Sequence, residues 1–139
     1  MFYHEKSGEL QINERGLMAC RLSPRYSHIK QEVAKLPPGS TVYEYGAGEG
    51  HVIVNLANEF PAIEFVAFDQ VHENIKRHGM YDGERPNLTS YHADTPEEAL
   101  EKVAHTRADL VICVEVLEHC PDPFIVIDGV EKLVNLCGS

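Results

Sequence analysis

The chain has 139 residues, which is the size of one domain, and hydrophobic residues make up 43% of it. With 12 basic and 22 acidic residues its net charge is −10, so its surface repels a phosphate backbone and nucleic-acid binding is disfavoured. The sequence has no apolar run long enough to span a bilayer and no secretory signal at its start, so we expect a cytoplasmic protein with reduced cysteines and no membrane span.

The start of the chain predicts an irregular arm followed by one core domain. Residues 1–22 have weak periodicity, so we assign them to an N-terminal arm and residues 23–139 to the core. Ser23 is a helix N-cap in this pattern and Pro24 takes the first helical position, while a Pro-Pro-Gly sequence at 37–39 marks the end. A helix of about a dozen residues is therefore expected between them.

The rest of the sequence alternates between strands and helices. The strands are expected at 41–45, 63–68, 88–93 and 109–114, and the helices at 51–60, 71–79, 95–106 and 122–137. Thr95 and Asp122 are each followed by proline and are predicted to cap the last two helices. This alternation implies right-handed crossovers and a parallel sheet covered on both faces. We therefore predict an α/β fold with a Rossmann-like, doubly wound parallel sheet.

A glycine-rich turn, GAGEG at residues 46–50, follows the first predicted strand. Glu44 precedes the turn, Glu49 lies inside it, and His51 stands where a dinucleotide fingerprint requires its last glycine. Because Glu49 would repel a pyrophosphate, a phosphate-bearing ligand fits this turn poorly. The turn suits a ligand that approaches the backbone closely and carries a cation for Glu44.

Acidic residues also follow the other predicted strands. Asp69, Asp94 and Glu115 each come directly after a strand, and ligands of doubly wound sheets bind beyond these carboxyl ends. Asp69 is placed for two hydrogen bonds to ribose hydroxyls. A nucleoside joined to a cationic amino acid fits this set, and S-adenosylmethionine is the common metabolite of that kind.

From about residue 40 onward the sequence resembles the class I S-adenosylmethionine-dependent methyltransferases. VYEYGAGEG is similar to their first motif, and FVAFD, YHADT and DLVICVEVLEHCPDP are similar to the next three, especially those of ubiquinone-biosynthesis O-methyltransferases. The resemblance implies that this cofactor donates a methyl group to a small-molecule acceptor. It implies cofactor contacts from Glu44, Gly46, Ala47, Gly48 and Gly50 on the methionine side, Asp69 with Gln70 near the ribose, Asp94 with Thr95 near the adenine, and Glu115 near the transferred methyl.

The segment after the fourth strand carries the candidate catalytic residues. Glu118 and His119 are assigned to catalysis, with His119 as general base, although a histidine that only caps a turn is an equal alternative. If this segment is helical, Glu115 shares one face with both residues, as in the metal site of RNA 3′-end 2′-O-methyltransferases, which this segment also resembles. Three ligands without a fourth form a weak site, so we predict no metal.

Family members continue beyond the fourth strand and its helix with a fifth strand and an antiparallel hairpin, which this sequence lacks. We therefore expect a core truncated at that point, with the strand at 109–114 on the sheet edge. Because an apolar edge strand favours association, self-association, a partner, or the C-terminal helix is expected to cover it. An active methyltransferase or its cofactor-binding core is the leading interpretation. A catalytically inactive cofactor-binding partner or regulatory module is one alternative, and a metal-dependent RNA 3′-end 2′-O-methyltransferase is another.

Overall fold

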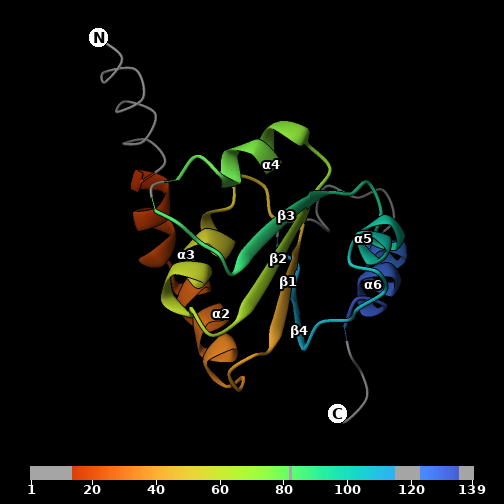
Figure 1. The fold of residues 1–139 in the computed structure, drawn as a ribbon, viewed down its shortest axis with the longest axis horizontal. Helices are drawn as coiled ribbons and strands as arrows, with labels where there is room; N and C mark the ends of the chain where they lie inside the picture. Colours follow the sequence, from red (N-terminus) through yellow and green to blue (C-terminus); the bar gives the residue numbers. More distant parts are fainter. Residues whose placement is uncertain (1–13, 82, 115–122, 135–139) are drawn as a thin grey trace.

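The computed structural model describes residues 14–81, 83–114 and 123–134 (Figure 1). A helical segment over 14–21 comes first and is followed by nine elements. In chain order these are α2 (Pro24–Ala34), β1 (Thr41–Tyr45), α3 (His51–Glu59), β2 (Glu64–Asp69), α4 (His72–His78), β3 (Leu88–His92), α5 (Pro96–Lys102), β4 (Leu110–Ile112) and α6 (Pro123–Glu131).

The four strands form one parallel sheet in the order β3-β2-β1-β4. The chain moves from β1 outward to β3 and then returns to place β4 on the other side of β1. The strand order therefore reverses between β1 and β4, where a doubly wound sheet binds its ligand. This topology confirms the predicted Rossmann-like core, and β4 is an edge strand of the described sheet, as expected.

Helices cover both faces of the sheet, with α2 and α3 on one side and α5 and α6 on the other (Figure 1). Each face has its own apolar cluster, because the buried strand residues point alternately to the two sides. The first cluster contains Tyr26, Ile29, Val33, Val42, Ile53, Leu56, Phe65 and Ile112, among others. The second contains Tyr43, Tyr45, Phe68, Ala93, Ala99, Ala108 and Leu133.

The predicted helix starts are confirmed at α2 and α5. The Ser23 hydroxyl accepts the N–H of Tyr26 at 3.2 Å, and Pro24 is the first residue of α2. The Thr95 hydroxyl likewise accepts the N–H of Glu98 at 3.1 Å at the start of α5. These caps satisfy amide groups that have no partner within the helix. Asp122, the third predicted cap, lies outside the described residues.

Several sequence expectations are wrong in detail, since the helix expected at 95–106 ends at Lys102 and the strand expected at 109–114 ends at Ile112. Residues 14–21 are helical instead of irregular, and Leu17 is only 2% exposed because this segment packs on the first cluster. The last helix ends at Glu131 instead of continuing to 137. Leu133 is fully buried, its carbonyl accepts the N–H of Ala108 at 2.8 Å, and Val134 forms a parallel bridge with Ala108. This tertiary pairing ends the helical pattern, which local sequence alone would continue.

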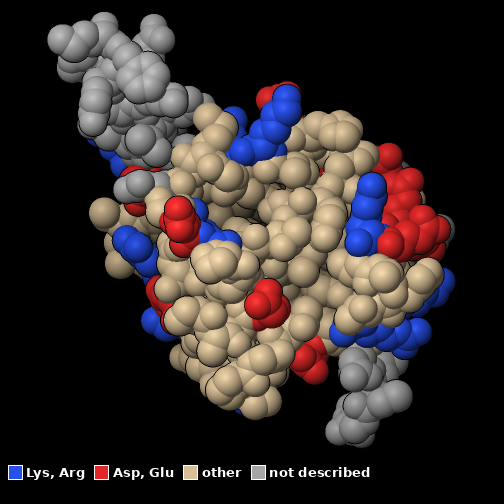
Figure 2. Space-filling model, viewed as in Figure 1, with Lys and Arg blue, Asp and Glu red and all other residues tan. Residues whose placement is uncertain are grey.

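Acidic and basic side chains are interspersed on the face seen in Figure 2. Basic residues there are separated by acidic and uncharged ones, so this face offers no continuous track for a phosphate backbone. Among the described residues, no helix has the length and apolarity needed to cross a membrane.

Candidate functional site

A cavity of about 560 Å³ lies at the carboxyl end of β1, where the strand order reverses. Its walls come from the glycine turn and the start of α3, from the helical segment 14–21 with the start of α2, and from Val114, two residues beyond β4. The lining residues are Gly16, Ala19, Cys20, Ser23, Arg25, Tyr26, Glu44, Gly46, Ala47, Gly48, Glu49, Gly50, His51, Val52 and Val114. Five of the predicted cofactor-binding residues are therefore brought to one cavity.

The glycine turn is anchored to the neighbouring strand β2. The amide groups of Gly46 and Ala47 both donate to the carbonyl of Phe68, at 2.8 and 3.0 Å. Gly48 has a φ of +58°, and a Cβ at this position would meet nothing within 4 Å. The backbone at Gly48 thus borders open space, which lets a ligand approach it closely.

Glu44 is the last but one residue of β1 and is only 3% exposed. The backbone N–H of Ile53 in α3 donates to its carboxyl group, whereas Oε1 has no hydrogen-bond partner among the described residues. Burial raises the pKa of Glu44 to about 8, since the charged form loses its hydration. A buried oxygen without a partner that lines a cavity is suited to a ligand cation or donor.

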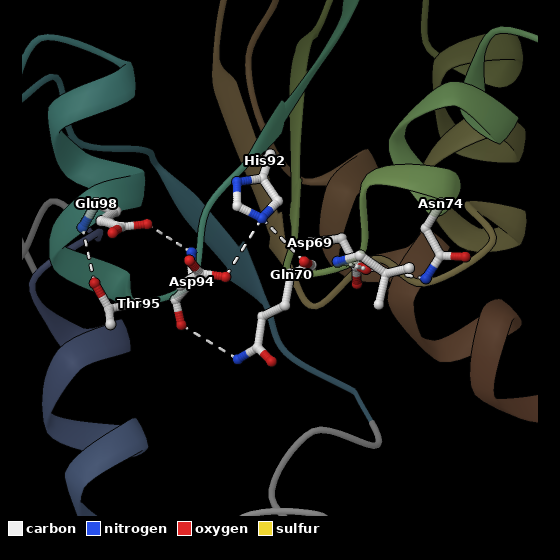
Figure 3. A network of polar contacts seen from close by, with 8 residues as sticks. Asp69, Gln70, Asn74, His92, Asp94, Thr95 and Glu98 are labelled. Carbon is white, nitrogen blue, oxygen red and sulfur yellow. Dashed lines mark hydrogen bonds and ion pairs between the residues drawn. The ribbon is translucent and has the colours of Figure 1, made fainter.

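Asp69, at the end of β2, joins the glycine turn to the start of α4, and Figure 3 shows its contact with Asn74 in that helix. Its Oδ1 accepts the N–H of Gly48 at 3.0 Å. Its Oδ2 accepts the N–H of Val71 at 3.0 Å and the side-chain amide of Asn74 at 2.9 Å. Asp69 is 9% exposed and both of its carboxylate oxygens already accept hydrogen bonds, so its first role is to fix the turn. The predicted ribose contacts must share these oxygens.

Gln70, Asp94 and Thr95 lie beside Asp69 at the ends of β2 and β3 (Figure 3). The Gln70 side-chain amide donates to the carbonyl of Asp94 at 3.2 Å, and the N–H of Asp94 donates to Glu98 at 2.7 Å. His92 lies between them, with Nε2 3.0 Å from the Gln70 carbonyl and 3.3 Å from the Asp94 carboxylate. These residues form a cluster next to the cavity, and their cofactor contacts stay predictions.

The remaining predicted site residues, Glu115, Glu118 and His119, lie outside the described residues. Within the described part of the chain, no group of three or more histidine, cysteine, aspartate or glutamate side chains is arranged to bind a metal.

Sequence reasoning missed the contribution of residues 14–21 to the cavity wall. Gly16, Ala19 and Cys20 all line it. The signal was the glycine at position 16: a Cβ there would overlap the His51 ring, so glycine lets this ring lie close to the segment. His78 and Tyr81, whose side chains bind backbone carbonyls of the glycine turn, were also missed, because no local sequence pattern marks them.

Comparisons with known proteins identify the family of this chain. The model of the family described as "Methyltransferase domain" matches residues 18–135. The ubiquinone biosynthesis O-methyltransferase of Psychrobacter cryohalolentis is 32% identical over 98 residues, which cover 69% of this chain and 37% of the relative. That of Sodalis glossinidius is 32% identical over 102 residues, which cover 73% and 39%. The chain thus spans less than half the length of these curated relatives.

Among solved structures, a SAM-dependent methyltransferase from Geobacter sulfurreducens in complex with S-adenosyl-L-homocysteine has the same fold, with a TM-score of 0.58. The two chains are 18% identical, and the match covers 81% of this chain and 45% of the other. The family match extends over most of the described residues and includes the glycine turn, Glu44 and Asp69. This chain therefore belongs to the methyltransferase domain family, which confirms the resemblance of its motifs to the class I S-adenosylmethionine-dependent methyltransferases.

Proposed function

We propose that the chain binds S-adenosylmethionine in the cavity beside Glu44 and is a methyltransferase or the cofactor-binding core of one. The single observation that carries this proposal is the buried Oε1 of Glu44, which has no partner among the described residues and lines a cavity bordered by the glycine turn. The cofactor's ammonium group would supply that partner, and the open space at Gly48 leaves room for its close approach. These residues fit the cofactor.

The proposed contacts divide between the cavity and the neighbouring cluster. Glu44 and the turn residues Gly46, Ala47, Gly48 and Gly50 are assigned to the methionine part of the cofactor. Asp69 with Gln70 is assigned to the ribose, and Asp94 with Thr95 to the adenine. The hydrogen bond between Gly48 and Asp69 supports this division, because it joins a residue of the methionine set to one of the ribose set.

The reaction proposed is transfer of the cofactor's sulfonium-bound methyl group to a nucleophilic atom of a small molecule. The names of the curated relatives favour an oxygen as that atom. Most of the catalytic effect of such a site comes from alignment of the two reactants, which a rigid turn and a defined cavity support. His119 is proposed as the base that accepts the acceptor's proton, with Glu118 next to it in sequence as the second catalytic residue, and Glu115 is assigned to the cofactor near the transferred methyl.

Isothermal calorimetry with S-adenosylmethionine, S-adenosylhomocysteine and NAD tests the proposal. We expect the first two to bind and NAD not to bind, because the turn has no basic side chain to neutralise a pyrophosphate. A folded sample that binds neither sulfur compound, or that prefers NAD, would refute the proposed function. Binding without methyl transfer to any acceptor would instead support an inactive cofactor-binding partner.

A partner at the edge of β4 is the second part of the proposal. Beside β4 and α6 lies an apolar groove of about 250 Å³, lined by Leu110, Val111, Cys113, Ile127, Val130, Glu131 and Val134. An apolar edge of this kind exposes strand groups that can pair with another chain. We propose that a second copy of the chain covers it. The chain's own Val134 bridges only Ala108, before β4 begins, so β4 itself has no second partner strand among the described residues.

A further inference from the structure

His78 lies buried between the glycine turn and β3 and uses both of its ring nitrogens. It is the last residue of α4 and is only 4% exposed. Nε2 lies 2.8 Å from the carbonyl oxygen of Gly48, and Nδ1 lies 2.8 Å from the hydroxyl of Ser90. Because a carbonyl can only accept, Nε2 carries the proton and Nδ1 accepts from Ser90. One neutral tautomer satisfies both contacts, and burial also favours the neutral ring by lowering the pKa of His78.

Tyr81 makes the same kind of contact with the next peptide of the turn. Its hydroxyl donates to the carbonyl of Glu49 at 2.7 Å, and the residue is 3% exposed. Its ring also packs edge to face against His51, a residue of the cavity wall, with the ring centroids 6.1 Å apart. Two successive carbonyls of the glycine turn are therefore bound by side chains from the end of α4 and the turn after it, and the N–H of Gly48 is bound by Asp69.

The position of Gly50 shows how closely the His78 ring fits against the turn. A Cβ at Gly50 would lie 2.5 Å from Cδ2 of His78, whereas a Cβ at Gly48 would meet nothing within 4 Å. Glycine is thus required at positions 48 and 50 for two different physical reasons. Gly50 makes room for the histidine behind the turn, and Gly48 leaves open the side on which we place the cofactor.

We propose that His78 and Tyr81 are positioning residues for the cofactor, because they fix the orientation of the Gly48 and Glu49 peptide groups. A turn with glycines at 46, 48 and 50, all at positive φ, has many alternative backbone conformations when nothing binds its carbonyls. The two hydrogen bonds select one of them before the ligand arrives, which lowers the entropic cost of binding. The inference rests on the proposed function, since it concerns the same cavity.

The test compares variants that remove or keep these hydrogen bonds. Tyr81→Phe removes only the hydroxyl, His78→Phe keeps the ring shape without either nitrogen, and His78→Gln restores a donor for the Gly48 carbonyl. Asn87→Ala is the matched control, because the Asn87 amide donates to the carbonyls of Ala57, Phe60 and Ile63, outside the cavity wall. All four are measured by calorimetry with S-adenosylhomocysteine, by thermal unfolding, and by hydrogen exchange of the peptide spanning the turn.

We expect Tyr81→Phe and His78→Phe to weaken binding by roughly five- to tenfold and to speed exchange in the turn. We expect His78→Gln to stay within about threefold of the original affinity, and Asn87→Ala to lower Tm without a change in affinity. Unchanged affinity in His78→Phe and Tyr81→Phe, or an equal loss in Asn87→Ala, would overturn the positioning role while the proposed function stands. No binding by the unmodified chain would overturn both.

Discussion

The N–H of Gly48 donates to Oδ1 of Asp69 at 3.0 Å, so the glycine turn after β1 is bonded directly to the last residue of β2. The Oδ2 atom of the same carboxylate accepts hydrogen bonds from the N–H of Val71, just before α4, and from the side-chain amide of Asn74 in α4. One side chain therefore fixes the relative positions of the two segments that we assign to the methionine and ribose parts of the cofactor.

Asp69→Ala is expected to reduce affinity for S-adenosylmethionine at least tenfold and to lower Tm as well. It removes the proposed ribose contacts together with the hydrogen bond to the turn, and hydrogen bonds to charged groups contribute about 1.5–3 kcal/mol each. Calorimetry measures the first effect and thermal unfolding the second. Asp109→Ala is the control, since Asp109 accepts the N–H of Thr41 at 2.8 Å at the opposite end of the sheet. Equal cofactor affinity in Asp69→Ala and the unmodified chain would refute the ribose assignment.

Gly48 and Gly50 should respond differently to substitution by alanine. Both have positive φ, which costs an ordinary residue roughly 1–2 kcal/mol. Gly50→Ala adds the overlap with His78, so it should lose about 1–3 kcal/mol more stability in urea unfolding. Gly48→Ala should remain folded, and Gly48→Val should weaken cofactor binding by about tenfold or more because its side chain enters the open space. Greater destabilisation by Gly48→Ala than by Gly50→Ala would contradict this division.

Glu44 should make the free energy of unfolding fall as the pH rises from about 4.5 to 8. Its pKa is raised by burial from 4.5 to about 8, so between these values the folded chain holds a proton that the unfolded chain has released. The contribution of this group to stability is therefore full below about pH 4.5 and is lost as the pH rises toward 8. Urea unfolding of the chain and of Glu44→Gln across this range measures the effect. We expect a steeper decline in the unmodified chain, and parallel curves would show that Glu44 does not titrate in this way.

Because Glu44 holds this proton near neutral pH, we expect cofactor binding to be accompanied by proton release. If the cofactor's ammonium group pairs with ionised Glu44, binding near neutral pH releases a proton from this residue. Calorimetry in buffers with different ionisation enthalpies measures this release. Glu44→Gln should abolish it and weaken affinity by roughly tenfold. Retention of the same proton release in Glu44→Gln would assign it to another group.

The apolar groove beside β4 should promote association between copies. Ile127 lines this groove and is 38% exposed, so Ile127→Lys should place a charge there without disturbing the core. Light scattering at increasing protein concentration should show an oligomer in the unmodified chain and a monomer in the variant. Leu22→Lys is the control, because Leu22 is 80% exposed and is not among the groove residues. A concentration-independent monomer in the unmodified chain would refute self-association.

Much of the fold follows from local signals in the sequence. The Ser-Pro and Thr-Pro pairs set the starts of α2 and α5, and β-branched and aromatic runs identify β1 and β2. The end of α6 could not be predicted, because burial of Leu133 and its pairing with Ala108 decide it.

The candidate site was predictable only where a motif marks it. Glu44 and the glycine turn were found because an acid and spaced glycines form a recognisable pattern, and the cavity contains them. His78 and Tyr81 were not found, since a histidine at a helix end and a tyrosine in a turn are ordinary surface residues in sequence. Their role arises from the packing of α4 against the back of the turn, which only the three-dimensional arrangement reveals.

The pairing of β1 with β4 also has a consequence for the order of folding. Thr41 and Asp109, which are hydrogen-bonded across these strands, are 68 positions apart, and Val114 beyond β4 lines the cavity. Contacts between such distant segments form late, because loop closure must precede any gain from them. A nascent chain that has already produced its glycine turn must therefore wait for β4 to emerge from the ribosome before it can complete the cavity wall.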